Sequence, residues 1–244
     1  MATRADDIQL TALGVRRINT DTDPEELVLP PASEQRLRRI ADWLVQPPPV
    51  LREWGLHRYI DGGLRALFRG PPGTGKTMAA IAIGRWSDRP LFHVDRDEIA
   101  NNYRDLFSLA DEEKAILLFD RADADIADLL KKLEPYEGLA ILATNRGGNL
   151  EPDAVSRLDG IVEFPMPDEA ARHELWRKLL ASAKLAKSHD IDAQSLAKNY
   201  DLSGAEILRS LRTAALLAAS EGKPVNMELL KHTAEERLKM RAGE

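Results

Sequence analysis

Apolar residues occur along the first two thirds of this chain in short runs, separated by polar stretches that favour helices. The most apolar runs, residues 115–119 and 139–144, suit strands that are buried on both faces of a parallel sheet. The five runs lie at residues 64–68, 90–94, 115–119, 139–144 and 161–164. They predict a five-stranded sheet.

The stretches between these runs follow a helical period. The clearest case is residues 126–133, where apolar side chains recur at intervals of three and four and Pro135 follows. Strands that alternate with helices at this spacing indicate βαβ units with right-handed crossovers. We therefore predict an α/β fold of three layers, in which a parallel five-stranded sheet lies between two layers of helices (αβα).

The pattern changes beyond Pro167, where strand-like runs cease. Asp168 precedes one helical stretch, Ser203 and Glu206 form a capping box at the start of another, and Asn226 begins the last. Residues 1–26 are polar and mixed in charge, which is typical of a loose arm. The predicted organisation is an N-terminal arm at 1–26, a large α/β domain at 27–167 and a helical lid domain at 168–244.

One motif, GPPGTGKT at residues 70–77, directly follows the first strand-like run. Its glycines allow successive backbone N–H groups to turn toward phosphate oxygens. Lys76 brings a positive charge to the terminal phosphates, and Thr77 offers its hydroxyl to Mg²⁺. The helix-forming residues that follow direct the positive end of a helix at the phosphates. An ordinary Gly/Pro turn, the alternative interpretation, does not explain both the strand before and the helix after.

Polar residues follow two of the other predicted strands, Asp120 after 115–119 and Asn145 after 139–144. Open α/β sheets bind ligands at the carboxyl ends of their strands, so both residues are expected to face the loop. Asp120 is suited to hold Mg²⁺ through water. Asn145 is suited to orient an attacking water or to sense the terminal phosphate, although an amide that merely starts the next turn is an equally good interpretation.

Composition excludes several classes of protein. The chain has no cysteine, which rules out disulfides, cysteine-ligated zinc and thiol catalysis. A net charge of -6 argues against a nucleic-acid partner held by bulk charge. The five histidines lack metal-ligand spacing and are interpreted as surface or packing residues. No apolar run approaches the roughly 18 residues of a spanning helix, and the N-terminus has no signal-like segment, so we expect a cytoplasmic protein without a membrane partner.

Together the motifs resemble those of the AAA family of ATPases. The resemblance rests on GPPGTGKT (Walker A), ILLFD (Walker B), LATN with NLEPDAVSRLD (sensor 1 and the arginine-finger region) and LSGAE (sensor 2), and it extends from about residue 27 to 240. It implies ATP and Mg²⁺ as cofactors, with Thr77 and Asp120 as the metal ligands. It implies Lys76, Asp120, Asn145 and Arg157 as catalytic residues, of which Arg157 would serve the nucleotide of a neighbouring subunit.

The resemblance also implies a set of nucleotide contacts. In the loop and the helix after it they are Gly70, Pro71, Pro72, Gly73, Thr74, Gly75, Lys76, Thr77 and Met78. In the lid they are Gly204 and Ala205, although Ser203 and Glu206 explain that motif equally well as a helix cap alone.

Departures from the family pattern bear on turnover. Arg121 stands where the family usually has the glutamate that polarises the attacking water, and losing such a base costs on the order of 10²- to 10⁴-fold in rate. Asp123 and Asp125 lie nearby but are interpreted as solvated carboxylates that begin the next helix. The chain is short where the family carries pore loops, and Tyr103 lacks the usual glycine two residues on. Arg157 has Ser156 and Asp159 as neighbours, where a second arginine is usual.

Two hypotheses of function follow. The first is an ATP-binding AAA module whose slow, Mg²⁺-dependent hydrolysis drives assembly or remodelling of a protein partner in a homo-oligomeric ring, such as a hexamer. The second, favoured by Arg121, is a degenerate AAA protein that binds ATP as a structural ligand or oligomerisation switch without turnover. A likeness to bacterial single-module AAA proteins suggests a phage-tail-like contractile injection system as the partner. A DNA-associated helicase loader fits the fold but not the acidic charge balance.

Overall fold

The computed structural model describes residues 10–19, 24–45, 53–55, 63–99, 102–120, 122, 126–145, 150–183 and 185–243. Contacts divide the described residues into two units. The sheet unit contains those up to residue 70 and residues 76–164, and the helical unit contains residues 71–75 and those from 165 onward. The domain boundaries at residues 26 and 167 stay a prediction.

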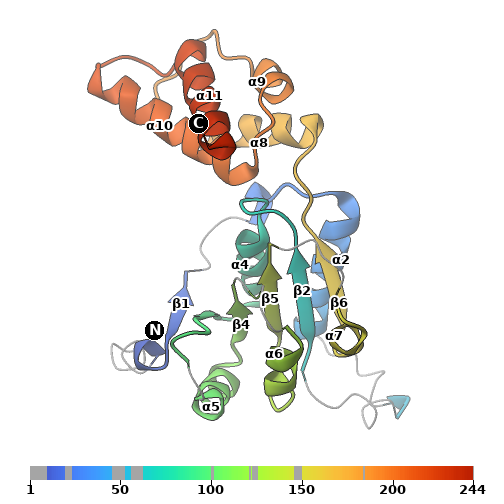
Figure 1. Cartoon of the computed structure of the whole chain (residues 1–244). Helices are drawn as coiled ribbons and strands as arrows, with labels where there is room; N and C mark the ends of the chain where they lie inside the picture. The colour runs from blue at the N-terminus through green and yellow to red at the C-terminus, as the bar shows by residue number, and fades with distance from the viewer. Residues whose placement is uncertain are drawn as a thin grey trace. The chain divides into compact units, whose positions relative to one another are not determined.

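Within the described ranges, six strands form the sheet of the sheet unit (Figure 1). Their order is β1-β3-β4-β5-β2-β6, and neighbouring strands are parallel except β1, which runs antiparallel to β3. The strands are β1 (Val15–Ile18), β2 (Arg65–Arg69), β3 (Leu91–Val94), β4 (Ile116–Phe119), β5 (Ala140–Thr144) and β6 (Gly160–Glu163). The five predicted runs are β2 to β6, which are parallel as predicted, so the predicted α/β fold is confirmed, and the antiparallel β1 makes the whole sheet mostly parallel.

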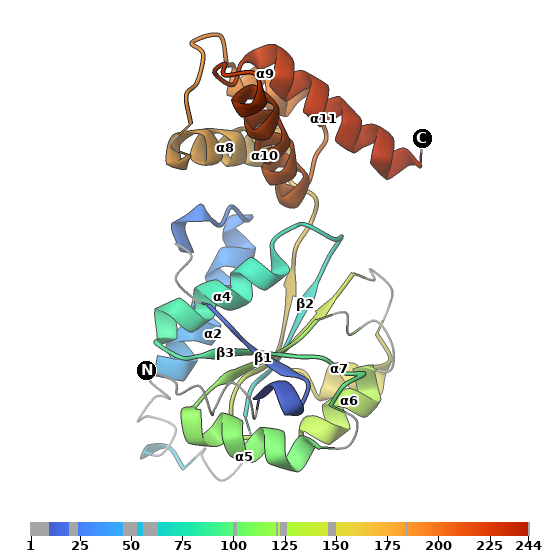
Figure 2. The same cartoon turned by 90° about the vertical axis from the view of Figure 1, so that its left-hand side faces the viewer.

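Helices cover both faces of this sheet (Figure 2). They are the short 3-10 helix η1 (Pro24–Glu26), α2 (Pro31–Val45), α4 (Lys76–Ser87), α5 (Tyr103–Glu113), α6 (Ile126–Leu133) and α7 (Pro152–Ser156). Side chains alternate along a strand, so Leu117 and Phe119 of β4 pack with α5 and α6, while Ile116 and Leu118 pack with α2 and α4. Burial on both faces is the reason that the central strands are continuous apolar runs.

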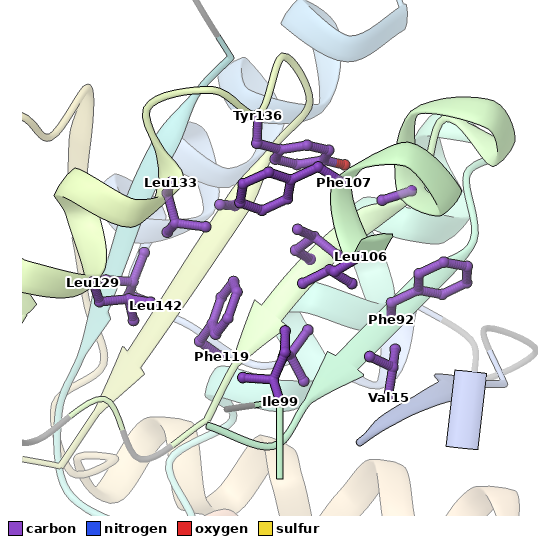
Figure 3. Close-up of a cluster of buried hydrophobic side chains, with 14 of the residues drawn as sticks. Val15, Phe92, Ile99, Leu106, Phe107, Phe119, Leu129, Leu133, Tyr136 and Leu142 are labelled. Atoms are coloured by element: carbon purple, nitrogen blue, oxygen red, sulfur yellow. The ribbon is translucent and has the colours of Figure 1, made fainter. Parts of the chain in front are cut away.

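The N-terminal segment differs from the loose polar arm that the sequence predicted. Residues 10–12 are helical, and β1 then pairs with β3, with Val15 opposite Val94. Leu10, Leu13 and Val15 are buried in the same core as Phe92, and Figure 3 shows Val15 and Phe92 within it. The apolar pattern here is short and interrupted by charges, but the open edge of β3 supplies hydrogen-bond partners that no local pattern reveals. The sheet therefore has a sixth strand.

The helical unit consists mainly of α8 (Glu169–Ser182), α9 (Ala193–Asn199), α10 (Gly204–Ser220) and α11 (Met227–Ala242). Their core contains the fully buried side chains of Trp176, Leu196, Ile207 and Leu230. The predicted caps are present. Asp168 accepts a hydrogen bond from the Ala171 N–H at 2.8 Å, and Ser203 and Glu206 form a reciprocal capping box. A helical C-terminal region is thus confirmed.

Candidate functional site

The predicted phosphate loop begins where β2 ends, and its first residue is tied to the neighbouring strand. The Gly70 N–H donates to the Thr144 carbonyl oxygen at 3.2 Å. A Cβ at Gly70 would lie 2.0 Å from the Phe164 carbonyl oxygen, closer than any real Cβ contact. Only glycine fits here, so the chain can enter the loop without a side chain blocking the ends of the strands.

The loop then turns through Pro71, Pro72, Gly73, Thr74 and Gly75. The Thr74 hydroxyl donates to the Pro71 carbonyl oxygen at 2.8 Å, which closes the turn, and Gly73 has a φ of +79°, where glycine is favoured. The Gly73 carbonyl oxygen accepts from the Ala205 N–H at 3.0 Å, within the helical unit. Gly204 and Ala205, the predicted lid contacts, are the first residues of α10, and Ala205 thus contacts Gly73 within this unit.

Lys76, Thr77 and Met78 form the first turn of α4. Lys76 is buried, 6% exposed, and its Nζ donates to the Gly70 carbonyl oxygen at 2.8 Å. Thr77 and Met78 are half-buried. The twelve-residue helix α4 presents the positive end of its dipole where these residues begin. A lysine and a hydroxyl at a helix N-terminus, directly after a glycine turn, suit a bound polyphosphate.

Asp120 and Asn145 follow two strands that lie next to β2. The order β4-β5-β2 makes the three strands adjacent and parallel, so all three end at the same edge of the sheet (Figure 1). Asn145 directly follows Thr144, the residue that bonds Gly70, and is exposed. Asp120 lies two strands from β2, about 10 Å at ~4.8 Å per strand, and its side chain is 35% exposed. The sheet thus brings both residues to the side where the loop begins.

The donor set fits magnesium bound together with a phosphate ligand. In the part of the chain that the structure describes, no three acidic or histidine side chains gather as in an all-protein metal site. Mg²⁺ usually keeps several waters and takes one or two protein ligands plus phosphate oxygens. Thr77 and Asp120 are the residues that would hold it.

Arg157 lies apart from these residues. It follows α7 and precedes β6, near the edge where β2 and β6 begin: Asp159, two residues on, exchanges hydrogen bonds with Arg65, the first residue of β2. The loop follows the other end of β2, and five residues at ~3.3 Å each put about 16 Å between the two ends. The Arg157 guanidinium instead contacts Glu134 and Asp153. Hydrogen bonding to Asp153, with attraction from both carboxylates, raises the pKa of Arg157.

Other residues singled out in the sequence have different surroundings. Tyr103 begins α5, where its ring lies 5.9 Å from that of Phe107 and Lys132 approaches it at 5.6 Å, so it packs against the core. Arg121, Asp123 and Asp125 lie outside the described residues.

Three residues that contact predicted site residues have no role in the sequence interpretation. His93 of β3 has its Nε2 4.0 Å from an Asp120 carboxylate oxygen, and only the pairing of β3 with β4 brings them together. Glu134 and Asp153 contact Arg157 from segments 23 and 4 residues away. The spacing of Asp153 on a helical turn could have indicated its contact, but nothing local indicates that of Glu134.

The model of the ATPase family associated with various cellular activities (AAA) matches residues 66–166. The proteasome-activating nucleotidase of Saccharolobus solfataricus is 28% identical over 223 residues, covering 78% of this chain and 55% of that protein. The ATP-dependent zinc metalloprotease FtsH of Caulobacter vibrioides is also 28% identical, covering 78% of this chain and 35% of that protein. The chain therefore spans about half the length, or less, of these curated relatives.

A solved structure of katanin, from a study of its self-assembly, matches the fold with a TM-score of 0.71. It is 23% identical, and the match covers 96% of this chain and 92% of that one.

Across the described residues, every helix is too short or too polar to cross a membrane. The family match, the relatives and the fold all agree with the loop and the strand ends described above. Members of the AAA family are ATPases. Residues 66–166 therefore match an AAA ATPase domain, with homology to the proteasome-activating nucleotidase and FtsH.

Proposed function

We propose that this chain binds ATP with Mg²⁺ at residues 70–77 and hydrolyses it slowly to assemble or remodel a protein partner. The observation that carries the proposal is the shared edge of β4, β5 and β2, which ends in Asp120, Asn145 and the glycine loop. A nucleotide-binding loop beside a carboxylate and an amide is the arrangement that phosphoryl transfer requires.

The chain's own residues take separate parts in this proposal. Backbone N–H groups of residues 70–75 and the Lys76 ammonium bind the phosphates, while Thr77 and Asp120 hold the metal. Mg²⁺, when bound, neutralises charge that develops on the phosphate oxygens. Asn145 orients the water that attacks the terminal phosphorus, and Gly204 with Ala205 contacts the nucleotide from the lid.

The proposal includes a ring of identical subunits. Arg157 lies about the length of β2 away from its own loop, so it suits the nucleotide of a second copy better than its own. An arginine that serves a neighbour requires a head-to-tail contact, and such contacts form a ring when the rotation between subunits closes. The ring size and the protein partner stay open. The relatives described above include a nucleotidase named for activating proteasomes and a protease, and neither supports a contractile injection system as the partner, so the proposal does not include one.

Phosphate release by the purified chain tests the proposal. With ATP and Mg²⁺, the wild-type protein should release phosphate above background, and Lys76→Ala should not. Lys198→Ala, which removes an exposed lysine of α9, is the matched control and should behave as wild type. Equal release from the wild type and Lys76→Ala would refute the proposal.

A second function, ATP binding without turnover, is favoured by Arg121, which replaces the usual glutamate. It predicts that ATP causes the chain to oligomerise, seen as a higher mass in solution, while no phosphate is released. Arg121→Glu separates the two functions: if hydrolysis then appears, the remaining site is competent and the natural protein uses ATP as a switch.

A further inference from the structure

Arg157 is held by two carboxylates of its own chain. Its Nε and Nη2 face the two oxygens of Asp153, at 3.4 and 3.5 Å, and its Nη1 donates to a carboxylate oxygen of Glu134. All three guanidinium nitrogens are thereby directed at acidic groups. These contacts occupy three of the five N–H groups of Arg157, and carboxylates compete with a phosphate for the same donors, so both carboxylates oppose phosphate binding by Arg157.

The backbone around this ion-pair cluster is anchored by Arg65, which is 6% exposed. Its Nη2 donates to the carbonyl oxygens of Leu133 and Tyr136, each at 2.5 Å, which fixes the segment that carries Glu134. Its backbone N–H donates to the Asp159 carboxylate at 2.7 Å, and its carbonyl accepts from the Asp159 N–H at 2.9 Å. Glu134 and Arg157 are thus carried by segments tied to the same buried residue.

The ion pairs themselves face solvent. The side chains of Arg157, Asp153 and Glu134 are 30%, 50% and 61% exposed. Exposed pairs of this kind hold weakly, by a few-fold each. The arrangement therefore combines a fixed backbone with contacts that a stronger ligand for the guanidinium can replace.

We propose that Glu134 and Asp153 are positioning residues that hold the Arg157 guanidinium within its own subunit, an arrangement called parking below. The nucleotide of a second copy has to displace both carboxylates. This inference rests on the proposed function, because it assumes that Arg157 serves a neighbouring site. Parking lowers the fraction of subunits in which Arg157 is available to bind a neighbour's nucleotide. It therefore restrains ATP hydrolysis until the copies assemble. Each carboxylate lowers that fraction by about two- to fivefold, the strength of an exposed ion pair.

Glu134→Gln is the cleaner variant, because Asp153 also lies 3.9 Å from the Lys131 ammonium. In the nucleotide-free protein, the rate at which phenylglyoxal modifies Arg157, followed by mass spectrometry, should rise about two- to fivefold. Glu112→Gln, which changes an exposed glutamate of α5, is the matched control and should leave that rate unchanged. This measurement needs neither turnover nor assembly. An unchanged or lower rate in Glu134→Gln overturns the inference.

Turnover and assembly give the second readout. Glu134→Gln should raise kcat, or lower the protein concentration at which ATP induces assembly, by a similar factor at unchanged KM. In the Arg157→Ala background the same substitution should change neither quantity. If Arg157→Ala alone has no effect on turnover or assembly, the proposed role of Arg157 in a neighbouring site fails. If Arg157→Ala is damaging but Glu134→Gln is also damaging, the carboxylates orient Arg157 rather than park it, and only the parking inference fails.

Discussion

At the carboxyl edge of the sheet, where β2 ends, Gly70 contributes only backbone, and that backbone binds Thr144 and Lys76. At the amino edge, the same strand begins with Arg65, whose guanidinium donates to the carbonyl oxygens of residues 64, 133, 136 and 138. At the carboxyl edge β2 is followed by a residue that has no side chain, whereas at the amino edge it begins with a buried arginine.

The two edges of the sheet use their hydrogen-bond donors differently. At the amino edge the donors of Arg65 are consumed within the protein, because a buried guanidinium has to be hydrogen-bonded. Burial lowers the pKa of Arg65, and Asp159 opposes that effect by favouring the charged form. At the carboxyl edge the closeness of Phe164 excludes any side chain at Gly70. We therefore expect the amino edge to contribute most to stability, and we propose that the carboxyl edge binds the ligand.

The largest effect on folding is expected at Arg65. Arg65→Ala leaves buried carbonyl oxygens without their donor and opens a cavity, and should lower the free energy of unfolding by about 2–4 kcal/mol. Arg65→Lys should recover only part of this, because one ammonium cannot reach four carbonyl groups. Urea unfolding measures both, with the exposed Arg16→Ala of β1 as a control that should lose little. A loss at Arg65 no larger than that at Arg16 would show that the amino edge does not depend on its buried charge.

The same contrast explains what the sequence could predict. The carboxyl edge was predictable because its parts are local: GPPGTGKT is contiguous, and Asp120 and Asn145 each directly follow an apolar run. The five strands and the caps at Asp168 and Ser203 were predictable for the same reason, since each depends on neighbours within a few residues.

The parts that could not be predicted depend on segments far apart in the chain. Strand β1 exists because the edge of β3 is open, and the contacts of Arg65 and Arg157 join segments 94 and 23 residues apart. Arg65 stands inside an apolar run, and no periodicity shows which carbonyl oxygens it will meet. The α9 helix was missed because it is only seven residues long. Long-range pairing is a property of the folded chain, and local patterns do not encode it.

Gly70→Ala tests the carboxyl edge. The added Cβ has to displace the Phe164 carbonyl, which overpacks the end of β2 and should cost about 1–3 kcal/mol of unfolding free energy. It should also weaken ATP binding, because the loop starts from a shifted position. Gly160→Ala is the matched control at the amino end of β6, where a Cβ meets no atom within 4 Å. Denaturant unfolding and nucleotide titration should show a loss at residue 70 only, and equal behaviour of the two variants would remove the contrast between the edges.

Tyr136 gives the amino edge a dependence on pH. Its buried hydroxyl donates to the Ala115 carbonyl oxygen at 2.5 Å, so Tyr136→Phe should cost about 0.5–1.5 kcal/mol at neutral pH. Burial raises the pKa of Tyr136 above its ordinary value of 10.0. The unfolded phenol ionises near pH 10 while the native one keeps its proton, so this contribution is present below pH 10 and is lost as the pH rises further.

The measurement for Tyr136 is the difference in unfolding free energy between the wild type and Tyr136→Phe from pH 7 to 11. That difference should be constant up to about pH 9 and shrink above pH 10. A difference that grows above pH 10 would mean that the native phenol is the more easily ionised one, contrary to its burial.

The smallest effect is expected from the ion pair at the carboxyl edge, where the Arg69 guanidinium holds Glu163 at 2.5 Å from Nη2 and 3.1 Å from Nε. The Glu163 side chain is 47% exposed, so Glu163→Gln should lower the free energy of unfolding by less than about 1 kcal/mol. Because salt screens exposed charges, this difference should shrink further in 1 M salt, where the Debye length is about 3 Å. The loss in Arg65→Ala should stay the same, because burial shields that guanidinium from dissolved ions. A salt-sensitive loss at Arg65, or a salt-insensitive one at Glu163, would mean that exposure does not separate the charges of the two edges.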